Sequence, residues 1–241
     1  MTHERAGLPA QDSDLVDVAK LITLYYADQP DPDNIDQRVA FGTSGHRGTS
    51  LRTSFNEQHI LATTQAIVEY RTMQGTDGPL FLAKDTHGLS EPAWVSALEV
   101  LAANDVAIRI DSRDGYTPTP ALSHAILAYN RGRSGGLADG IVVTPSHNPP
   151  TDGGFKYNPP DGGPASSEAT GWIQDRANAL IAAGMAGVKR IPLGTALALD
   201  STSTYDFLDA YSRDLPNVLN LDAVRDAGLK LGADPMGGAA V

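Results

Sequence analysis

The stretch LFLAKDTHGLSEPAWVSALEVLAANDVAIRI, residues 80–110, sets the expected fold. It opens with an apolar run, 80–83, that is typical of a strand buried on both faces. Ser90 and Pro92 then open a helix whose apolar positions recur every three or four residues. A second apolar run, 106–110, follows. A strand, a helix and a strand at this spacing predict a right-handed crossover between parallel strands.

The same alternation continues on both sides of this stretch. Upstream, Ser54 followed by Glu57 predicts a capping box at the start of an amphipathic helix. Downstream, Thr119 and Pro120 predict a helix start, and the apolar run 141–143 predicts a third strand. We therefore expect an α/β fold with a mixed, mainly parallel sheet sandwiched by helices. The other expected elements are helices over about 14–27, 167–183 and 203–215, the last capped by Ser or Thr, and a strand over 229–233.

The expected domain organisation has three parts. Residues 1–39 form an amino-terminal extension with a helix, residues 40–205 form the main α/β domain, and residues 206–241 begin a second, similar domain. The glycine turn 234–238 follows the last expected strand, and the sequence stops three residues later, as in an interrupted βαβ unit. We therefore expect the 241 residues to be a fragment or a truncated product.

Composition narrows the possible partners. The formal net charge of −11 leaves no surplus of Lys and Arg with which to bind nucleic acid. The segment 1–14 is polar and has no apolar run, so we do not expect a secretory signal there. No run approaches the roughly 18 apolar residues of a membrane span. The absence of cysteine fits a reducing compartment. We expect a cytoplasmic protein that binds neither nucleic acid nor membrane, and the composition leaves its oligomeric state open.

The motif TPSHNPP, residues 144–150, carries the strongest chemical signal. It directly follows the strand 141–143, at the carboxyl end where open α/β sheets place their ligands. Its prolines stiffen the loop and hold the hydroxyl of Ser146 in one direction. The alternative interpretation is an exposed serine in a proline-rich turn, and position and rigidity make the two about equal.

Other segments add weaker signals. GTSGHRG, residues 42–48, combines backbone N–H groups with Arg47 and so suits a phosphate. DGGFKYN, residues 152–158, puts Lys156 beside the serine loop, although a lone lysine is usually a surface charge. The segment 84–87 ends a strand and is typical of a solvated loop in which Asp85 could pair with Lys84. The segment 116–120 is typical of a helix entry.

Taken in order, these motifs resemble those of the α-D-phosphohexomutase superfamily, and specifically its bacterial phosphoglucomutases. The matching segments are FGTSGHRG (41–48), TPSHNPP (144–150) and GFKYN (154–158), and DPMGG (234–238) resembles the opening of the family's second domain. The resemblance implies that Ser146 carries a phosphoryl group, one oxygen of which ligates Mg²⁺. It also implies that the substrate and the reacting phosphoryl group are lined by Thr43, Arg47, His147 and Lys156.

The implied reaction interconverts glucose 1-phosphate and glucose 6-phosphate through a bound glucose 1,6-bisphosphate that reorients between two transfers. Physical chemistry agrees with these roles, because phosphoryl transfer depends on positioning and charge stabilisation. Arg47 and Lys156 can neutralise charge on the phosphoryl oxygens. Either Lys156 or His147 could move the proton, and the sequence does not choose between them.

The chain departs from the family pattern in one respect. The family holds its metal in an Asp-x-Asp-x-Asp-Arg loop, which this sequence lacks, and the segment 31–36 fails as a substitute because its spacing is wrong. We therefore expect the 241 residues alone to be inactive or nearly so. The alternatives are a non-catalytic sugar-phosphate binding module and a mutase for mannose or glucosamine phosphate. A serine hydrolase is disfavoured because Ser146 lacks the Gly-x-Ser-x-Gly elbow.

Overall fold

The centre of the sheet consists of strands that are buried along their whole length. In the computed structural model, which describes residues 5–42 and 45–240, β2 (Leu80–Lys84) and β4 (Asp139–Val143) are buried at every position and pair in parallel. Such continuous burial is expected where helices cover both faces. β5 (Gly153–Asn158) follows β4 in the chain and is its antiparallel neighbour.

Within the described residues the sheet has six strands, in the order β1-β5-β4-β2-β3-β6. The remaining strands are β1 (His46–Gly48), β3 (Ile108–Asp111) and β6 (Thr202–Tyr205). The pairs β2–β3, β2–β4 and β3–β6 are parallel, and the pairs β1–β5 and β4–β5 are antiparallel. The prediction of a mixed, mainly parallel sheet is therefore confirmed, although β1, β5 and β6 were not predicted as strands.

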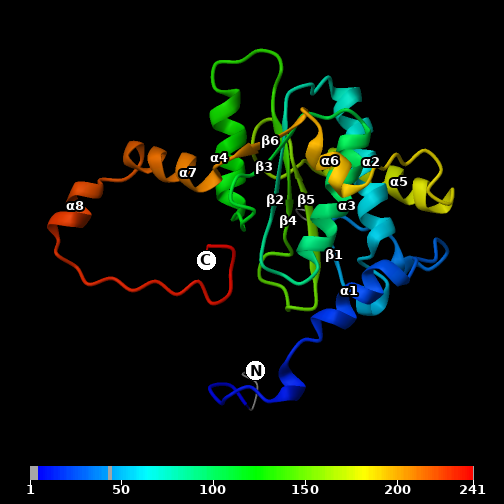
Figure 1. Ribbon diagram of the computed structural model, residues 1–241, viewed down its shortest axis with the longest axis horizontal. Helices are drawn as coiled ribbons and strands as arrows, with labels where there is room; N and C mark the ends of the chain where they lie inside the picture. The colour runs from blue at the N-terminus through cyan, green and yellow to red at the C-terminus, as the bar shows by residue number, and fades with distance from the viewer. Residues whose placement is uncertain (1–4, 43–44, 241) are drawn as a thin grey trace.

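Helices cover both faces of the sheet (Figure 1). One side carries α2 (Glu57–Gln74), α3 (Ser90–Ala103), α5 (Ser167–Ala182) and α6 (Leu193–Ala198). The other side carries α4 (Thr119–Asn130) and α7 (Phe207–Asp214), which pack against each other. The predicted three-layer sandwich is thus confirmed.

Two further helices lie outside these layers. α1 (Val18–Ala27) packs against the 3-10 turn Ser50–Arg52 that follows β1. α8 (Leu221–Asp226) lies beyond α7, away from the sheet (Figure 1). None of the described helices combines the length and the apolar character that crossing a bilayer requires.

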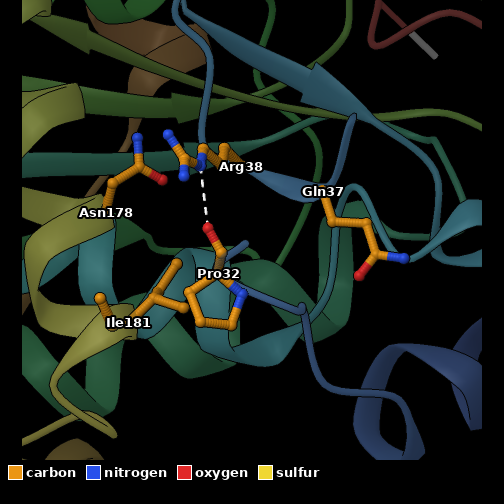
Figure 2. Close-up of a pocket in the computed structure, with 6 residues that line it drawn as sticks. Pro32, Gln37, Arg38, Asn178 and Ile181 are labelled. Atoms are coloured by element: carbon orange, nitrogen blue, oxygen red, sulfur yellow. Dashed lines mark hydrogen bonds between the residues drawn. The ribbon is translucent and has the colours of Figure 1, made fainter. Parts of the chain in front are cut away.

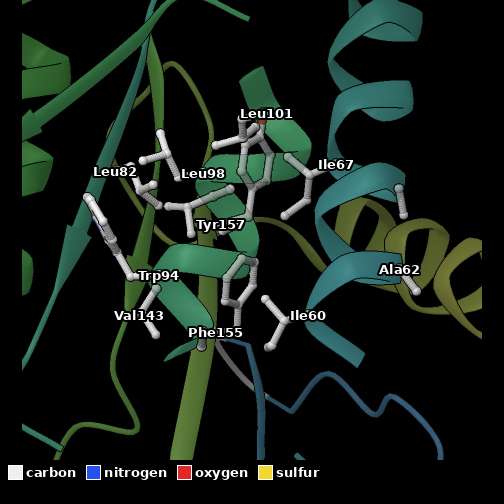
Figure 3. Packing of buried hydrophobic residues seen from close by; sticks show 14 of the residues in the cluster. Ile60, Ala62, Ile67, Leu82, Trp94, Leu98, Leu101, Val143, Phe155 and Tyr157 are labelled. Carbon is white, nitrogen blue, oxygen red and sulfur yellow. The ribbon is translucent and has the colours of Figure 1, made fainter. Parts of the chain in front are cut away.

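The two faces of the sheet bury separate clusters of apolar side chains. Leu82 packs with the residues of α2 and α3, whereas its neighbour Phe81 packs with Leu122 of α4 and with Phe207. This division follows from the alternation of side chains along a strand. Figure 3 shows side chains of α2 and α3, among them Ile60 and Leu98, meeting those of the strands. Each fully buried large side chain contributes about 1.5–3 kcal/mol, so the strands that carry the candidate site are firmly held.

The predicted capping box at Ser54 is wrong. α2 begins after Asn56, which forms a reciprocal capping box with His59. The Ser54 hydroxyl is committed elsewhere, because it accepts a hydrogen bond from the Thr49 backbone N–H at 3.0 Å. The expected first helix also begins late, at Val18, where the Asp17 side chain caps it.

The predicted helix over 203–215 is wrong in its first part. Residues 202–205 form β6, because the exposed edge of β3 offers backbone partners for a parallel strand. The helix that follows is capped by Asp206, not by Ser or Thr, and the Asp206 carboxylate accepts a hydrogen bond from the Asp209 N–H at 2.9 Å.

The predicted strand over 229–233 is also wrong. These residues are exposed and have no regular secondary structure. A strand needs a neighbouring strand for its backbone groups, and within residues 5–42 and 45–240 none pairs with this segment. The division of the chain at residues 39/40 and 205/206 stays a prediction.

Candidate active site

Ser146 lies in the loop directly after the central strand β4. Its side chain is exposed, and its backbone adopts a left-handed conformation with φ of 73°. Such a conformation costs a non-glycine residue about 1–3 kcal/mol and persists only where the surroundings impose it. One such constraint is local, because the Ser146 N–H donates to the hydroxyl of buried Thr144 at 2.9 Å.

Lys156 of β5 points at the serine. The antiparallel register sets Lys156 opposite Val142 of β4, and its Nζ donates to the Ser146 Oγ at 2.6 Å. The lysine is 7% exposed. Burial and the nearby Arg47 guanidinium lower the pKa of Lys156 below its ordinary value of 10.5, while Asp85 opposes this shift. The amine is therefore more easily deprotonated than an ordinary lysine.

Arg47 of β1 reaches the same loop. β1 pairs with β5, with Arg47 opposite Gly154, and the Arg47 Nε donates to the Pro145 carbonyl at 3.2 Å. Gly154 is required here for packing, because a Cβ at this position would collide with the Thr144 carbonyl. Gly45 likewise has φ of 147° and lies against Lys156, where a side chain would not fit. Because Gly45 and Gly154 have no side chains, β5 can lie close to the segment before β1 and to the Ser146 loop.

Asp85 and His87 belong to the same site. His87 Nδ1 lies 2.9 Å from an Asp85 carboxylate oxygen, and its Nε2 lies 3.1 Å from the Asn148 carbonyl oxygen. The segment is therefore more than the solvated loop that its sequence suggests. Its position after a strand was visible in the sequence, but the parallel pairing that puts the carboxyl end of β2 beside that of β4 was not.

Lys84 does not pair with Asp85, contrary to expectation. It is the last residue of β2 and is buried, with its Nζ 2.6 Å from Glu91 and 3.0 Å from Asp114. Successive residues of a strand point to opposite faces, which explains why Lys84 and Asp85 find different partners.

A cleft of about 900 Å³ opens at this edge of the sheet. His147, like Ser146, is exposed and lines it. The segment 117–120, expected to be only a helix entry, also lines the cleft at the amino end of α4. From the far end of the chain, residues 235–239 line it as well, and the Thr86 hydroxyl donates to the Gly237 carbonyl.

The structure therefore brings Ser146, Lys156 and Arg47 into one cluster and leaves His147 on the cleft surface. The predicted ligand Thr43 lies outside the described residues.

A second hollow, of about 190 Å³, lies between the last turn of α5 and the segment 32–38 that precedes β1. Figure 2 shows Arg38 beside Asn178, with the Arg38 Nε donating to the Pro32 carbonyl at 2.9 Å. Asn178 exchanges two hydrogen bonds with the backbone of Val39. These contacts attach the connector before β1 to α5.

The described residues do not by themselves fit a magnesium site. Mg²⁺ prefers six oxygen ligands in octahedral geometry. In the described ranges no group of three or more His, Cys, Asp or Glu could hold a metal ion.

A serine that follows a central strand, contacted by a lysine and with an arginine bound to its loop, is an arrangement that suits a phosphoryl group. The chain belongs to a family defined by such a domain. Residues 38–183 match the family model for the phosphoglucomutase/phosphomannomutase alpha/beta/alpha domain I. The resemblance expected from the motifs is confirmed.

Known relatives agree with this assignment. The chain is 56% identical over 236 residues to a phosphoglucomutase of Komagataeibacter xylinus, a match that covers 98% of this chain and 42% of that protein. It is 30% identical over 221 residues to phosphoglucomutase 1 of Saccharomyces cerevisiae, covering 82% of this chain and 37% of the yeast protein. The chain thus spans about two fifths of the length of these curated relatives.

A solved structure shows the same fold. The open form of parafusin from Paramecium, an exocytosis-sensitive phosphoprotein described as a phosphoglucomutase, superposes with a TM-score of 0.68 at 21% identity. The superposition covers 88% of this chain and 40% of parafusin.

Proposed function

We propose that this chain supplies the phosphoryl-carrying serine of a cytoplasmic phosphoglucomutase. The observation that carries the proposal is the contact between the Lys156 Nζ and the Ser146 Oγ at 2.6 Å, in a loop that Arg47 also binds. The family membership and the 56% identity to a phosphoglucomutase support the reaction type.

The proposed transfer uses Ser146 as the phosphoryl acceptor. The Oγ attacks the phosphorus of a sugar bisphosphate, the bond between Oγ and phosphorus forms, and the bond to the sugar oxygen breaks. The serine proton passes to the neutral amine of Lys156, and the departing sugar oxygen takes up a proton from water in the open cleft to become a hydroxyl group. In the reverse transfer the Lys156 ammonium returns its proton to the Oγ.

Lys156 is better placed than His147 to move this proton. Lys156 touches the reacting oxygen, and its lowered pKa increases the fraction of neutral amine. His147 is exposed on the cleft surface, where it can contact a bound substrate. Arg47 would neutralise charge on the phosphoryl oxygens, and Thr43 stays a predicted substrate ligand.

The substrates are also proposals. Glucose 1-phosphate and glucose 6-phosphate, with glucose 1,6-bisphosphate as the intermediate, follow from the similarity to phosphoglucomutases. Mg²⁺ bound through the Ser146 phosphoryl group would require oxygen ligands beyond those that the described residues provide.

The test is phosphoryl labelling in the natural protein that contains this sequence. Incubation with glucose 1,6-bisphosphate carrying labelled phosphate should label Ser146. Ser146→Ala should abolish the label, and Ser112→Ala, at another exposed serine, should retain it. Label that persists in Ser146→Ala would refute the assignment. Calorimetric binding of glucose 1-phosphate without any labelling would instead favour a sugar-phosphate binding module.

A further inference from the structure

The loop that carries Ser146 is held from a third direction, by His87. This residue lies in the connection between β2 and α3, and its side chain is 14% exposed. Its two ring nitrogens face two different groups, the Asp85 carboxylate at 2.9 Å and the Asn148 carbonyl at 3.1 Å. The ring therefore links the end of β2 to the serine loop, two residues beyond Ser146.

Both partners of the His87 ring can only accept hydrogen bonds. A carboxylate and a backbone carbonyl carry no proton to donate, and a neutral imidazole carries a single N–H. A neutral ring would leave one nitrogen lone pair facing an acceptor oxygen. Only the imidazolium form, with a proton on each nitrogen, satisfies both contacts.

The charges around the ring favour the same form. The charged groups that face it are Asp85, from its own connection, and Asp152, from the serine loop. The hydrogen bond to Asp85 is the largest influence and raises the pKa of His87 above 6.5, while partial burial opposes the shift. Asp152 also accepts a hydrogen bond from the Asn148 side chain at 3.0 Å, so both ends of Asn148 are held.

Asp85 connects the ring to Ser146 by a second route. Its carboxylate accepts hydrogen bonds from the His87 N–H at 3.0 Å and the Ser90 hydroxyl at 2.5 Å, and it also interacts with the Thr144 hydroxyl. Thr144 in turn accepts the Ser146 N–H. Ser146, with its left-handed backbone, is therefore held on both sides, through Thr144 before it and Asn148 after it.

We propose that His87 is a positioning residue that acts as an imidazolium, pinning the Asn148 carbonyl so that Ser146 keeps its left-handed conformation and its aim at Lys156. The proposal rests on the proposed function of Ser146. Both ring nitrogens are occupied by the protein, so His87 acts through the loop without binding the phosphoryl group.

The first experiment needs no enzymatic activity. In the 241-residue chain labelled with ¹⁵N, nuclear magnetic resonance at pH 6.5 should show protons on both ring nitrogens in most His87 rings, whereas an ordinary imidazole is about half protonated there. The Asn148 and Ser146 signals should shift together as the ring loses a proton at higher pH. A ring that is mostly neutral, with a bare Nε2, at pH 6.5 would overturn the proposal.

The second experiment separates the two ring contacts in the natural protein that contains this sequence. In His87→Gln the amide nitrogen can take the place of Nε2 and keep the bond to Asn148. In His87→Asn it can take the place of Nδ1 and keep only the bond to Asp85. A misplaced nucleophile costs on the order of 10²-fold in rate, so His87→Asn should lose roughly that factor in the rate of Ser146 labelling, with KM little changed. His87→Gln should lose much less.

A merely structural role predicts a different pattern. Equal losses in both variants, with equal losses of thermal stability, would overturn the proposal. A variant that does not fold leaves the decision to the ring protonation measured in the first experiment. If Ser146 is never labelled while His87 is an imidazolium, the proposed function fails and the positioning contact stands.

Discussion

Removing the ammonium of Lys156 should slow phosphoryl transfer to Ser146 by about two orders of magnitude. The Nζ lies 2.6 Å from the Oγ and is buried. At this distance, and at an effective dielectric constant of about 20, two unit charges interact by about 6 kcal/mol. If the serine proton has passed to the Lys156 amine in the transition state, an ammonium lies beside about half a charge on the serine oxygen, and its loss costs about 3 kcal/mol, or on the order of 200-fold in rate. This value lies within the 10²–10³ typical of a lost charge-stabilising donor.

The assay is rapid-quench measurement of Ser146 labelling from glucose 1,6-bisphosphate in the natural protein that contains this sequence. Lys156→Met should show the full loss, and Lys189→Met, at an exposed lysine, should show none. Lys156→Arg separates two roles, because arginine keeps the charge but cannot accept a proton. The wild-type rate should rise with pH as the neutral fraction of Lys156 grows, and the arginine variant should lack this rise. A Lys156→Met rate within about threefold of wild type would refute the reasoning.

Three further predictions concern the fold that carries the site. Gly154→Ala should displace the Thr144 carbonyl, destabilise the chain by about 1–3 kcal/mol and slow Ser146 labelling. Gly171→Ala, in an open position of α5, should by contrast be neutral or stabilising by up to about 1 kcal/mol, and urea denaturation compares the two. Arg71→Met should lower the free energy of unfolding by about 3–5 kcal/mol, because the Asp139 carboxylate that it binds at 2.7 Å is fully buried. An unchanged urea midpoint would show that Asp139 finds another partner. Burial lowers the pKa of His46 to about 3 and also lowers that of the stacked His59. Because the unfolded chain binds these protons first, stability should be full above pH 6.5 and fall between pH 6.5 and about 3. The loss of unfolding free energy over this pH range should be smaller in His46→Phe, and an equal loss in that variant would contradict the prediction.

The local patterns of the sequence were sufficient for the layers of the fold. Continuous apolar runs at 80–83 and 141–143, separated by helical periodicity, predicted buried parallel strands between helices. The edge strands were missed because they lack this signal. Residues 202–205 contain no aliphatic side chain and form a strand only because β3 offers its edge. Pairing of this kind depends on a partner far along the chain, which no local pattern records.

The candidate site was likewise only partly predictable from the sequence. The motif at 144–150 was sufficient to select Ser146, since a stiff loop after a buried strand can be recognised locally, and the motif at 154–158 was sufficient to suggest Lys156. The inclusion of His87 came only from the tertiary structure. The parallel pairing of β2 with β4 brings the end of residues 80–84 beside the serine loop, and this pairing turns an ordinary Asp-Thr-His segment into a support for Ser146.

The sequence by itself determined which chemical groups are present, a rigid serine, a lysine and an arginine, because these depend on residue types and on local chain stiffness. The tertiary structure decided their distances and their protonation. The register of β4 against β5 sets the contact between Ser146 and Lys156, and burial sets the lowered pKa of that lysine. The contact depends on the pairing of two strands, and the pKa depends on the burial of Lys156, so both exist only after the chain has folded.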